Sequence, residues 1–151
     1  MATSPKPVDL TSLNSEELKD VKRQLDLEIE QLTQSYTTLR TARNRFIECQ
    51  NAVEITSKKE NEGKEILVPL TVSLYVPGKI KNTEMVNVDL GTGYHVDMTA
   101  AKAMEFYKGK VEYVEKSLSE IERILDSKAQ NGGIVTQVLR EKIAQASAQS
   151  A

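Results

Sequence analysis

Residues 18–53 read LKDVKRQLDLEIEQLTQSYTTLRTARNRFIECQNAV, and a bulky apolar side chain recurs in them at every seventh position. A seven-residue apolar repeat is typical of helices that pack along a coiled-coil seam. No Gly or Pro interrupts residues 15–57, so we expect one helix there, about 65 Å long at the usual rise per residue. Asn14 is the expected N-cap, with Glu17 as its capping-box partner. The repeat consists of Leu18, Leu25, Leu32, Leu39, Phe46 and Val53.

A second apolar series lies further along the chain and alternates steps of three and four residues, which again predicts a helix that faces a seam. Thr99 is its expected N-cap. Gly132 and Gly133 each disfavour a helix interior by up to about 1 kcal/mol. We therefore expect this helix to span residues 99–131, followed by a hinge, a short helical extension and a tail in residues 132–151. The series consists of Met104, Tyr107, Val111, Val114, Leu118, Ile121 and Leu125.

Between the two helical series, apolar residues alternate with period two, as in β-strands that have one covered face. Gly91-Thr92-Gly93 has the composition of a hairpin turn, and Pro77-Gly78 fits a type II turn. We therefore expect two β-hairpins over residues 65–98. A few short strands leave unpaired edges, which favours pairing between subunits in an oligomer platform. The expected platform residues are Val68, Leu70, Val72, Leu74, Val76, Val86, Val88, Leu90, Tyr94 and Val96.

The two helices have matching positions for pairing within one chain. If they fold back antiparallel, Val53 lies near Met104, Phe46 near Val111, Leu39 near Leu118 and Leu32 near Leu125, so apolar residues meet at each step. The expected fold class is mainly α with small β. It is a long antiparallel intramolecular coiled coil with a two-β-hairpin insert at the closed end and both termini at the open end. A chain of 151 residues suits a single domain, with residues 1–13 as a flexible arm.

The amino-acid composition limits the classes of function that the chain can have. Apolar residues make up 39% of the chain and charged residues 28%, which suits exposed helix faces better than a large globular core. The net charge of −2 gives no preference for nucleic acid or an anionic membrane. The apolar-rich run over residues 66–76 is too short to span a bilayer, and residues 1–9 lack the apolar core of a secretory signal. The single cysteine, Cys49, permits no internal disulfide, so a reduced intracellular setting is expected.

No arrangement of residues in the sequence predicts catalysis, a cofactor or a metal site. Gly91-Thr92-Gly93 lacks the third glycine of a dinucleotide loop, and His95 has no cluster of Cys or His to join. Cys49 is expected to be a buried heptad residue rather than a redox switch. Short basic groups at Lys58-Lys59 and at residues 79–81 are interpreted as solvated surface, with a contact to another protein as the alternative. The aromatic residues expected in the seam are Tyr36, Phe46, Phe106 and Tyr107.

Three pieces of the β region, in their order and spacing, resemble the alpha-class subunits of prefoldin. They are Glu65-Ile66-Leu67-Val68-Pro69-Leu70, then Val76-Pro77-Gly78-Lys79-Ile80, then Val86-Asn87-Val88-Asp89-Leu90-Gly91-Thr92-Gly93-Tyr94-His95-Val96. Together with the flanking helices, the resemblance covers about residues 15–130. It implies that the first hairpin turns near Leu70 to Ser73, with Pro77-Gly78 at a strand end, and we follow it for the register of that hairpin.

The resemblance also implies an activity. Prefoldin is a hexamer of two alpha-class and four beta-class subunits, and its arms hold unfolded chains such as actin and tubulin without ATP. It passes them to the cytosolic group II chaperonin, so a cytoplasmic location is expected, with a nuclear pool left open. The rival functions are a coiled-coil scaffold and a regulatory adaptor that binds one partner through its helices.

Apolar residues at the arm tip have two interpretations, and the sequence leaves both open. They either complete the coiled coil or form an exposed surface that contacts clients. These candidate client contacts are Leu10, Leu13, Ile134, Val135, Val138, Leu139 and Ile143.

Overall fold

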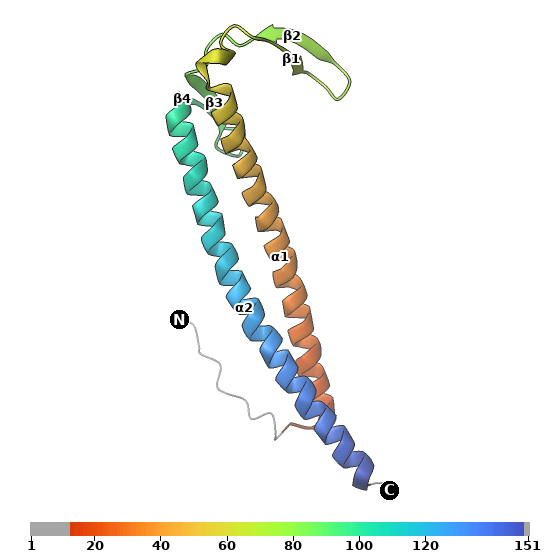
Figure 1. Ribbon diagram of the computed structural model, residues 1–151. Helices are drawn as coiled ribbons and strands as arrows, with labels where there is room; N and C mark the ends of the chain where they lie inside the picture. Colours follow the sequence, from red (N-terminus) through yellow and green to blue (C-terminus); the bar gives the residue numbers. More distant parts are fainter. Residues whose placement is uncertain (1–12, 150–151) are drawn as a thin grey trace. The chain divides into compact units, whose positions relative to one another are not determined.

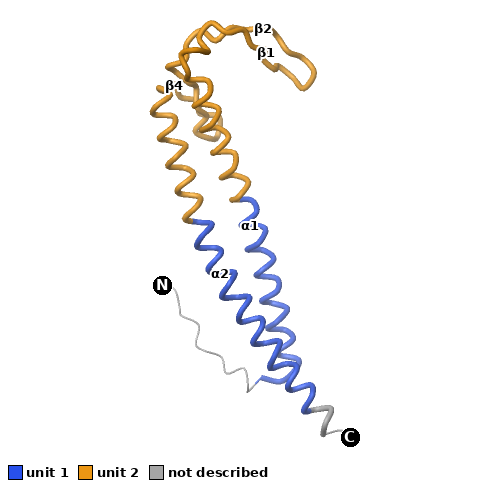
Figure 2. Tube along the Cα trace, viewed as in Figure 1, with its two compact units in different colours: residues 1–38, 117–151 blue, residues 39–116 orange. Residues whose placement is uncertain are grey.

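The computed structural model describes residues 13–149, and side chains as far as residue 145. Helix α1 (Ser15–Thr56) is followed by a short 3-10 turn, η1 (Lys59–Asn61), by four strands and by helix α2 (Ala100–Gln149) (Figure 1). The strands are β1 (Glu65–Pro69), β2 (Tyr75–Lys79), β3 (Met85–Asp89) and β4 (His95–Thr99). The chain forms two compact units: unit 1 is Met1–Thr38 with Ser117–Ala151, and unit 2 is Leu39–Lys116 (Figure 2).

Both helices begin at the predicted caps. The Asn14 backbone N–H donates to Glu17 Oε2 and the Glu17 N–H donates to Asn14 Oδ1, each at 2.8 Å. This reciprocal pair is the capping box that the sequence predicts. At the second helix, the Lys102 N–H donates to Thr99 Oγ1 at 3.4 Å. The fold class predicted from the sequence is confirmed: two long antiparallel helices contact each other, with two β-hairpins between them.

Helix α2 continues through Gly132 and Gly133 to Gln149, so the prediction that it ends at this pair is wrong. The two glycines disfavour the helix by up to about 1 kcal/mol each. Beyond them the helix buries Val135, which is 2% exposed, and the Thr136 hydroxyl donates to the Gly132 carbonyl at 2.7 Å. Tertiary packing of an apolar face contributes more to helix stability than local propensity does.

The first hairpin pairs β1 with β2, from Glu65 opposite Lys79 to Pro69 opposite Tyr75. The Leu70 N–H donates to the Leu74 carbonyl at 2.8 Å, which closes the turn at residues 70–74. The register that follows the prefoldin resemblance is therefore confirmed, and the alternative of a turn at Pro77-Gly78 is wrong, because that dipeptide lies inside β2. Leu70, Val72 and Leu74 consequently belong to the turn and not to the strands.

The second hairpin pairs β3 with β4, from Met85 opposite Thr99 to Asp89 opposite His95. Gly91, Thr92 and Gly93 all have positive φ, at 105°, 53° and 83°, which confirms the predicted turn at this tripeptide. Leu90 and Tyr94 flank that turn just outside the strands, and the Leu90 N–H donates to the Tyr94 carbonyl at 2.8 Å. The two hairpins form two separate two-stranded sheets.

In unit 1, polar side chains tie α1 to α2 in the predicted antiparallel register. Lys128 Nζ donates to Glu28 Oε2 at 2.6 Å, and the Tyr36 hydroxyl donates to Glu122 Oε1 at 2.6 Å. Near the start of α1, Lys142 Nζ donates to the Leu13 carbonyl. These pairs agree with the predicted register to within about one helical turn.

In unit 2, the two helices pack through aromatic rings and small apolar side chains. The rings of Phe46 and Tyr107 lie 6.5 Å apart between centroids, and Tyr107 also stacks edge-to-face on Phe106 at 5.5 Å. Arg43 Nη1 lies 3.9 Å from Glu115 Oε1. The same antiparallel register therefore holds here.

Candidate functional site

The structure buries or half-buries every predicted seam residue. Leu18 is fully buried, and Val53, Val114 and Leu118 are also buried. The other predicted positions are half-buried: Leu25, Leu32, Leu39, Phe46, Met104, Tyr107, Val111, Ile121 and Leu125. These side chains are occupied in holding α1 and α2 together and leave little surface for a ligand.

The second hairpin packs on the helices of its own unit. Val88 of β3 is 1% exposed and forms a core cluster with Val53 of α1 and Ala103 of α2. Val86 and Met98 pack against that cluster from the same hairpin. On the opposite side, the Asn87 side chain donates to Asp97 Oδ1 at 2.7 Å, so this hairpin has one apolar and one polar face.

Cys49 and Tyr107 are in contact beside the second hairpin. Burial raises the pKa of the Tyr107 hydroxyl, and the charge and hydrogen bond of Cys49 raise it further. Cys49 itself is exposed, so the prediction that it is a buried heptad residue is wrong.

The first hairpin exposes apolar side chains along its whole length. Every residue of β1 is exposed, and in β2 only Gly78 is half-buried. Exposed fractions of its large apolar side chains range from 37% at Val68 and Val76 to 96% at Val72. The full set is Ile66, Leu67, Val68, Leu70, Val72, Leu74, Tyr75 and Val76. Contiguous apolar surface of this kind marks an interaction site on a protein of otherwise hydrophilic surface.

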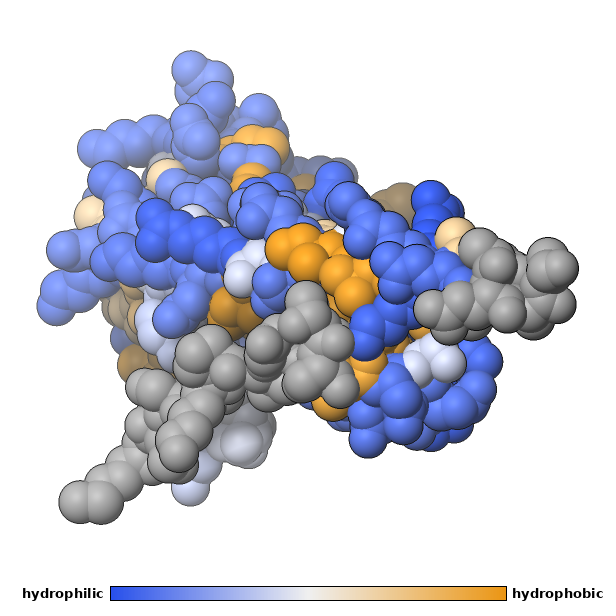
Figure 3. Space-filling model, turned by 90° about the horizontal axis from the view of Figure 1, so that it is seen from below, coloured by the Kyte–Doolittle hydropathy of each residue, from blue (hydrophilic) through white to orange (hydrophobic). Residues whose placement is uncertain are grey.

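The candidate client contacts in unit 1 fall into three groups. Ile134 is 52% exposed and Ile143 is 50% exposed. Leu13, Val138 and Leu139 are half-buried, and Val135 is buried between the helices. Leu10 lies outside the described residues. We refer to Leu13, Ile134, Val138, Leu139 and Ile143 as the tip surface. Seen end-on, apolar patches interrupt the hydrophilic surface of the molecule (Figure 3).

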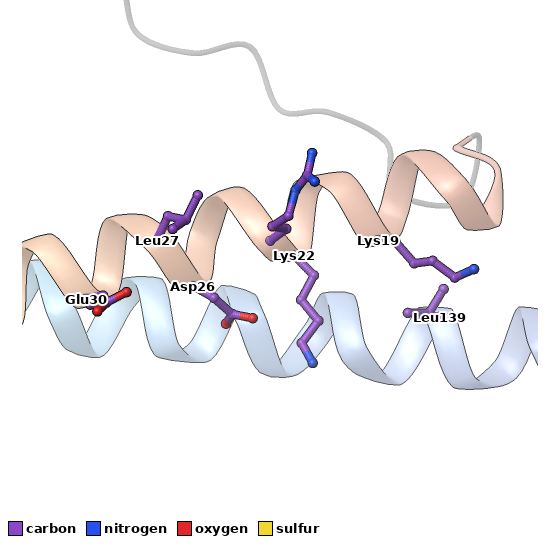
Figure 4. Close-up of a pocket in the computed structure, with 7 residues that line it drawn as sticks. Lys19, Lys22, Asp26, Leu27, Glu30 and Leu139 are labelled. Carbon is purple, nitrogen blue, oxygen red and sulfur yellow. The ribbon is translucent and has the colours of Figure 1, made fainter.

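A groove of about 410 Å³ lies next to the tip surface in unit 1. Its lining is mostly charged and comes from one side of α1, with Leu139 contributed by α2. Leu139 points toward α1 beside Lys19, whereas Leu27 points away from α2 (Figure 4). Leu27 is 48% exposed. The groove is therefore a shallow surface feature between charged side chains, and it lacks the enclosed apolar lining of a small-molecule site.

The described residues offer no arrangement for metal chemistry or membrane insertion. No three His, Cys, Asp or Glu side chains in residues 13–145 are placed to hold a metal ion. No helix in that part of the chain is long and apolar enough to cross a bilayer. His95 is exposed at the start of β4, opposite Asp89.

Residues 25–147 match the family model described as prefoldin subunit. The chain belongs to the prefoldin family. A probable prefoldin subunit 5 from Schizosaccharomyces pombe is 44% identical over 144 residues, which cover 94% of this chain and 93% of that protein. Prefoldin subunit 5 from Homo sapiens is 38% identical over 141 residues, which cover 93% of this chain and 91% of that protein. A chain of filamentous PFD from Methanocaldococcus jannaschii overlaps 81% of this chain and 89% of its own length with a TM-score of 0.44 at 20% identity.

Membership of this family settles the broad function. The chain is a homologue of prefoldin subunit 5, and the family consists of chaperone subunits rather than enzymes. The co-chaperone role is thereby the function of the chain at the level of the family. The described residues carry two exposed apolar surfaces, the first hairpin and the tip surface.

Sequence reasoning overlooked two buried residues of unit 2. Ala103 is fully buried in the core of unit 2 although it lies outside the predicted seam series. Thr83 is 4% exposed in the connection between the hairpins. A small residue one turn from Thr99 signals close helix approach, but nothing in the sequence signals the burial of Thr83.

Proposed function

We propose that this chain is one of two alpha-class subunits in a hetero-hexamer that also contains four beta-class subunits. The hexamer captures unfolded proteins such as actin and tubulin without ATP and transfers them to the cytosolic group II chaperonin. It works in the cytoplasm. The observation that carries this proposal is the division of exposed apolar surface between a β-hairpin and the tip surface, in a prefoldin-family chain whose seam is already filled.

The first hairpin supports the assembly part of the proposal. A two-stranded hairpin is marginally stable on its own in water, and its exposed edges can pair with other strands. The eight large apolar side chains of this hairpin have no cover within the described chain. In the complex, neighbouring subunits cover these side chains. The surface that is exposed in the single chain then forms the central contact of the complex.

The tip surface supports the capture part of the proposal. Ile134 and Ile143 are about half exposed on a helix whose remaining surface is largely charged. One apolar contact worth about 1.4 kcal/mol changes affinity only tenfold. Several arms that hold the same client raise the overall affinity through effective concentration. Such weak individual contacts also permit release to the next chaperone.

The capture step is tested by a triple variant, Ile134→Ser with Val138→Ser and Ile143→Ser. The matched control is Ile124→Ser, which changes an isoleucine of α2 that is 41% exposed but lies outside the tip surface. Each variant is assembled into the full complex and tested for suppression of aggregation of chemically denatured actin. The triple variant is expected to lose most of this suppression, because apolar client contacts are removed, while the control retains it. If the triple variant forms an intact complex and suppresses actin aggregation as well as wild type, these residues have no role in client binding.

The assembly step is tested by the mass of the native complex isolated from cell extract. A particle of six small coiled-coil chains is the expected result. A homodimer would favour a coiled-coil scaffold, and a single chain bound to one larger protein would favour a regulatory adaptor.

A further inference from the structure

The side chains of the asparagines in this chain are held to different degrees. Most of them form a hydrogen bond that fixes the amide group. The Asn82 side-chain oxygen, for example, accepts the Glu84 N–H at 2.7 Å. The side chains held by such a bond are those of Asn14, Asn44, Asn61, Asn82 and Asn87.

Two asparagines lack a bond of this kind. Among the described residues, none forms a hydrogen bond with the side chain of Asn51 in α1 or of Asn131 in α2. Both asparagines are exposed and lie within their helices. They differ in the next residue, which is Ala52 in α1 and Gly132 in α2. Asn131 is also the one asparagine of the sequence that precedes a glycine.

An asparagine that precedes a glycine can close a ring with its own backbone. The backbone nitrogen of the next residue attacks the side-chain Cγ, and a Cβ on that next residue hinders the approach. Glycine has no Cβ. At Gly132, no atom beyond the chain neighbours and the local helix backbone lies within 4 Å of the position that a Cβ would occupy. The Gly132 nitrogen is therefore unhindered, whereas the methyl group of Ala52 stands beside the nitrogen that follows Asn51.

The helix controls how fast this ring closure runs. In an α-helix ψ is about −42°, and the N–H of residue 132 is bonded to the carbonyl four residues earlier. The nitrogen is thus occupied and turned away from the Asn131 side chain, so the reaction requires a local opening of α2. Gly132 and Gly133 favour this opening, because only proline is a poorer helix former than glycine. Local opening of this kind occurs in folded proteins without global unfolding.

We propose that Asn131 is a site of spontaneous deamidation in α2. The Gly132 nitrogen forms a bond to Asn131 Cγ, and the bond from Cγ to Nδ2 breaks. Ammonia leaves with the proton of the Gly132 N–H, and a five-membered cyclic imide remains. Water then opens the imide at one of its two carbonyls. Opening at Cγ yields aspartate, and opening at the backbone carbonyl yields isoaspartate, in which the main chain continues through the former side chain.

Both products alter the part of α2 that holds the tip surface, and the effect on clients rests on the proposed client role of that surface. Each product adds a negative charge three residues after Lys128, on a neighbouring position of the helix surface. There it competes with Glu28 for the Lys128 ammonium group. Isoaspartate also adds one atom to the main chain, which interrupts the helical hydrogen-bond ladder. Val135, which is 2% exposed, lies beyond the interruption, so we expect conversion to loosen the tip surface from α1.

The first test measures conversion at each asparagine in the assembled complex. The complex is incubated at neutral pH and body temperature, sampled over several weeks, digested at mildly acidic pH and analysed for isoaspartate by mass spectrometry. Asn131 is expected to convert at least about tenfold faster than Asn51, because the residue after Asn51 carries a Cβ. No conversion at Asn131, or equal conversion at the two sites, overturns the proposal.

A pair of alanine variants separates steric hindrance from helix stability. Gly132→Ala and Gly133→Ala raise helix propensity equally, but only Gly132→Ala places a Cβ beside the attacking nitrogen. Conversion of Asn131 in the Gly133→Ala complex is expected to exceed that in the Gly132→Ala complex at least about tenfold. Equal rates in the two variants contradict ring closure by the Gly132 nitrogen.

The effect on client capture is read from the same samples. The aged wild-type complex is expected to lose suppression of actin aggregation in step with the isoaspartate at position 131, whereas a Gly132→Ala complex of the same age retains it. Repair of isoaspartate by a protein isoaspartyl methyltransferase should restore the aged wild type. Full suppression by a complex in which most of Asn131 has converted overturns the effect on the tip surface. If fresh wild-type complex fails to suppress aggregation, the proposed function is wrong, and the mass measurement still decides the deamidation.

Discussion

Val88 and Val96 are directly opposite each other in the second hairpin and form a matched pair for a stability experiment. Val88 is 1% exposed in the core cluster of unit 2, whereas Val96 is 41% exposed. Replacing either by Ala removes the same two methyl groups from neighbouring positions of one sheet. Any difference between the two variants therefore reports the difference in burial.

The expected magnitudes follow from these exposures. Each buried methyl-sized group contributes about 0.8 kcal/mol, and a residual cavity adds to the loss. Val88→Ala is expected to lower the free energy of unfolding by about 2 kcal/mol, which changes the folding equilibrium roughly 30-fold. Val96→Ala is expected to lower it by about 1 kcal/mol or less, because this side chain keeps much of its contact with water.

Urea unfolding of the isolated chain, followed by circular dichroism, measures both values. Amide hydrogen exchange of β3 and β4 then shows where protection is lost, since local opening reports local packing. Equal destabilisation by the two variants, or a larger effect of Val96→Ala, would refute the packing of the second hairpin on its own helices. If the second hairpin stays packed on its own helices in the assembled complex, Val96→Ala is expected to keep its small effect there.

Three further perturbations have defined outcomes. The hydrogen bond from Lys128 holds the pKa of Glu28 below its usual range, so this pair stabilises the fold above the unfolded-state pKa of about 4.3. That contribution disappears as the pH falls through the lower folded-state pKa. The melting-temperature difference between wild type and Glu28→Gln should therefore shrink on going from pH 7 to pH 3. A melting-temperature difference that stays constant would contradict a stabilising role of the Glu28–Lys128 pair. Gly132→Ala with Gly133→Ala is expected to raise helix stability by up to about 2 kcal/mol, because nothing lies within 4 Å of either added Cβ; an unchanged or lower melting temperature argues against the regular helix there. Gly78→Ala places a methyl group 3.1 Å from Val68 Cγ2 and should reduce the yield of complex on size-exclusion chromatography, whereas Gly109→Ala, which meets no atom within 4 Å, should leave it unchanged.

The helices show how far local sequence rules extend. The start of α1 was predictable to the residue, since Asn14 and Glu17 form a self-contained capping box that needs no tertiary contact. The course of α2 beyond Gly132 was not, because the glycine penalty is local and visible, whereas the burial of Val135 depends on the partner helix. A propensity of about 1 kcal/mol per glycine is readily outweighed by tertiary packing.

The first hairpin shows a different limit. Pro77-Gly78 has the composition of a turn, but Pro77 also fits a strand wherever its nitrogen points to an outer edge. Residues 70–74, which form the actual turn, contain no Gly or Pro. Thr71 provides the missing turn chemistry, because its hydroxyl accepts the Leu74 N–H at 3.1 Å. Only the family resemblance placed this turn correctly.

The difference in burial between the two hairpins is nevertheless predictable from the sequence. The signal lies at the positions between the alternating apolar residues. In the second hairpin, the residues between the apolar positions are Asn87, Asp89, His95 and Asp97, all polar. In the first hairpin, the corresponding residues are Leu67, Pro69, Tyr75 and Pro77, all apolar or aromatic. A strand with polar residues on one side needs one cover and finds it on its own helices. A strand that is apolar on both sides needs two covers, and the described residues leave the large apolar side chains of this hairpin exposed. The exposure of the first hairpin is therefore signalled by its intervening residues rather than by the apolar repeat itself.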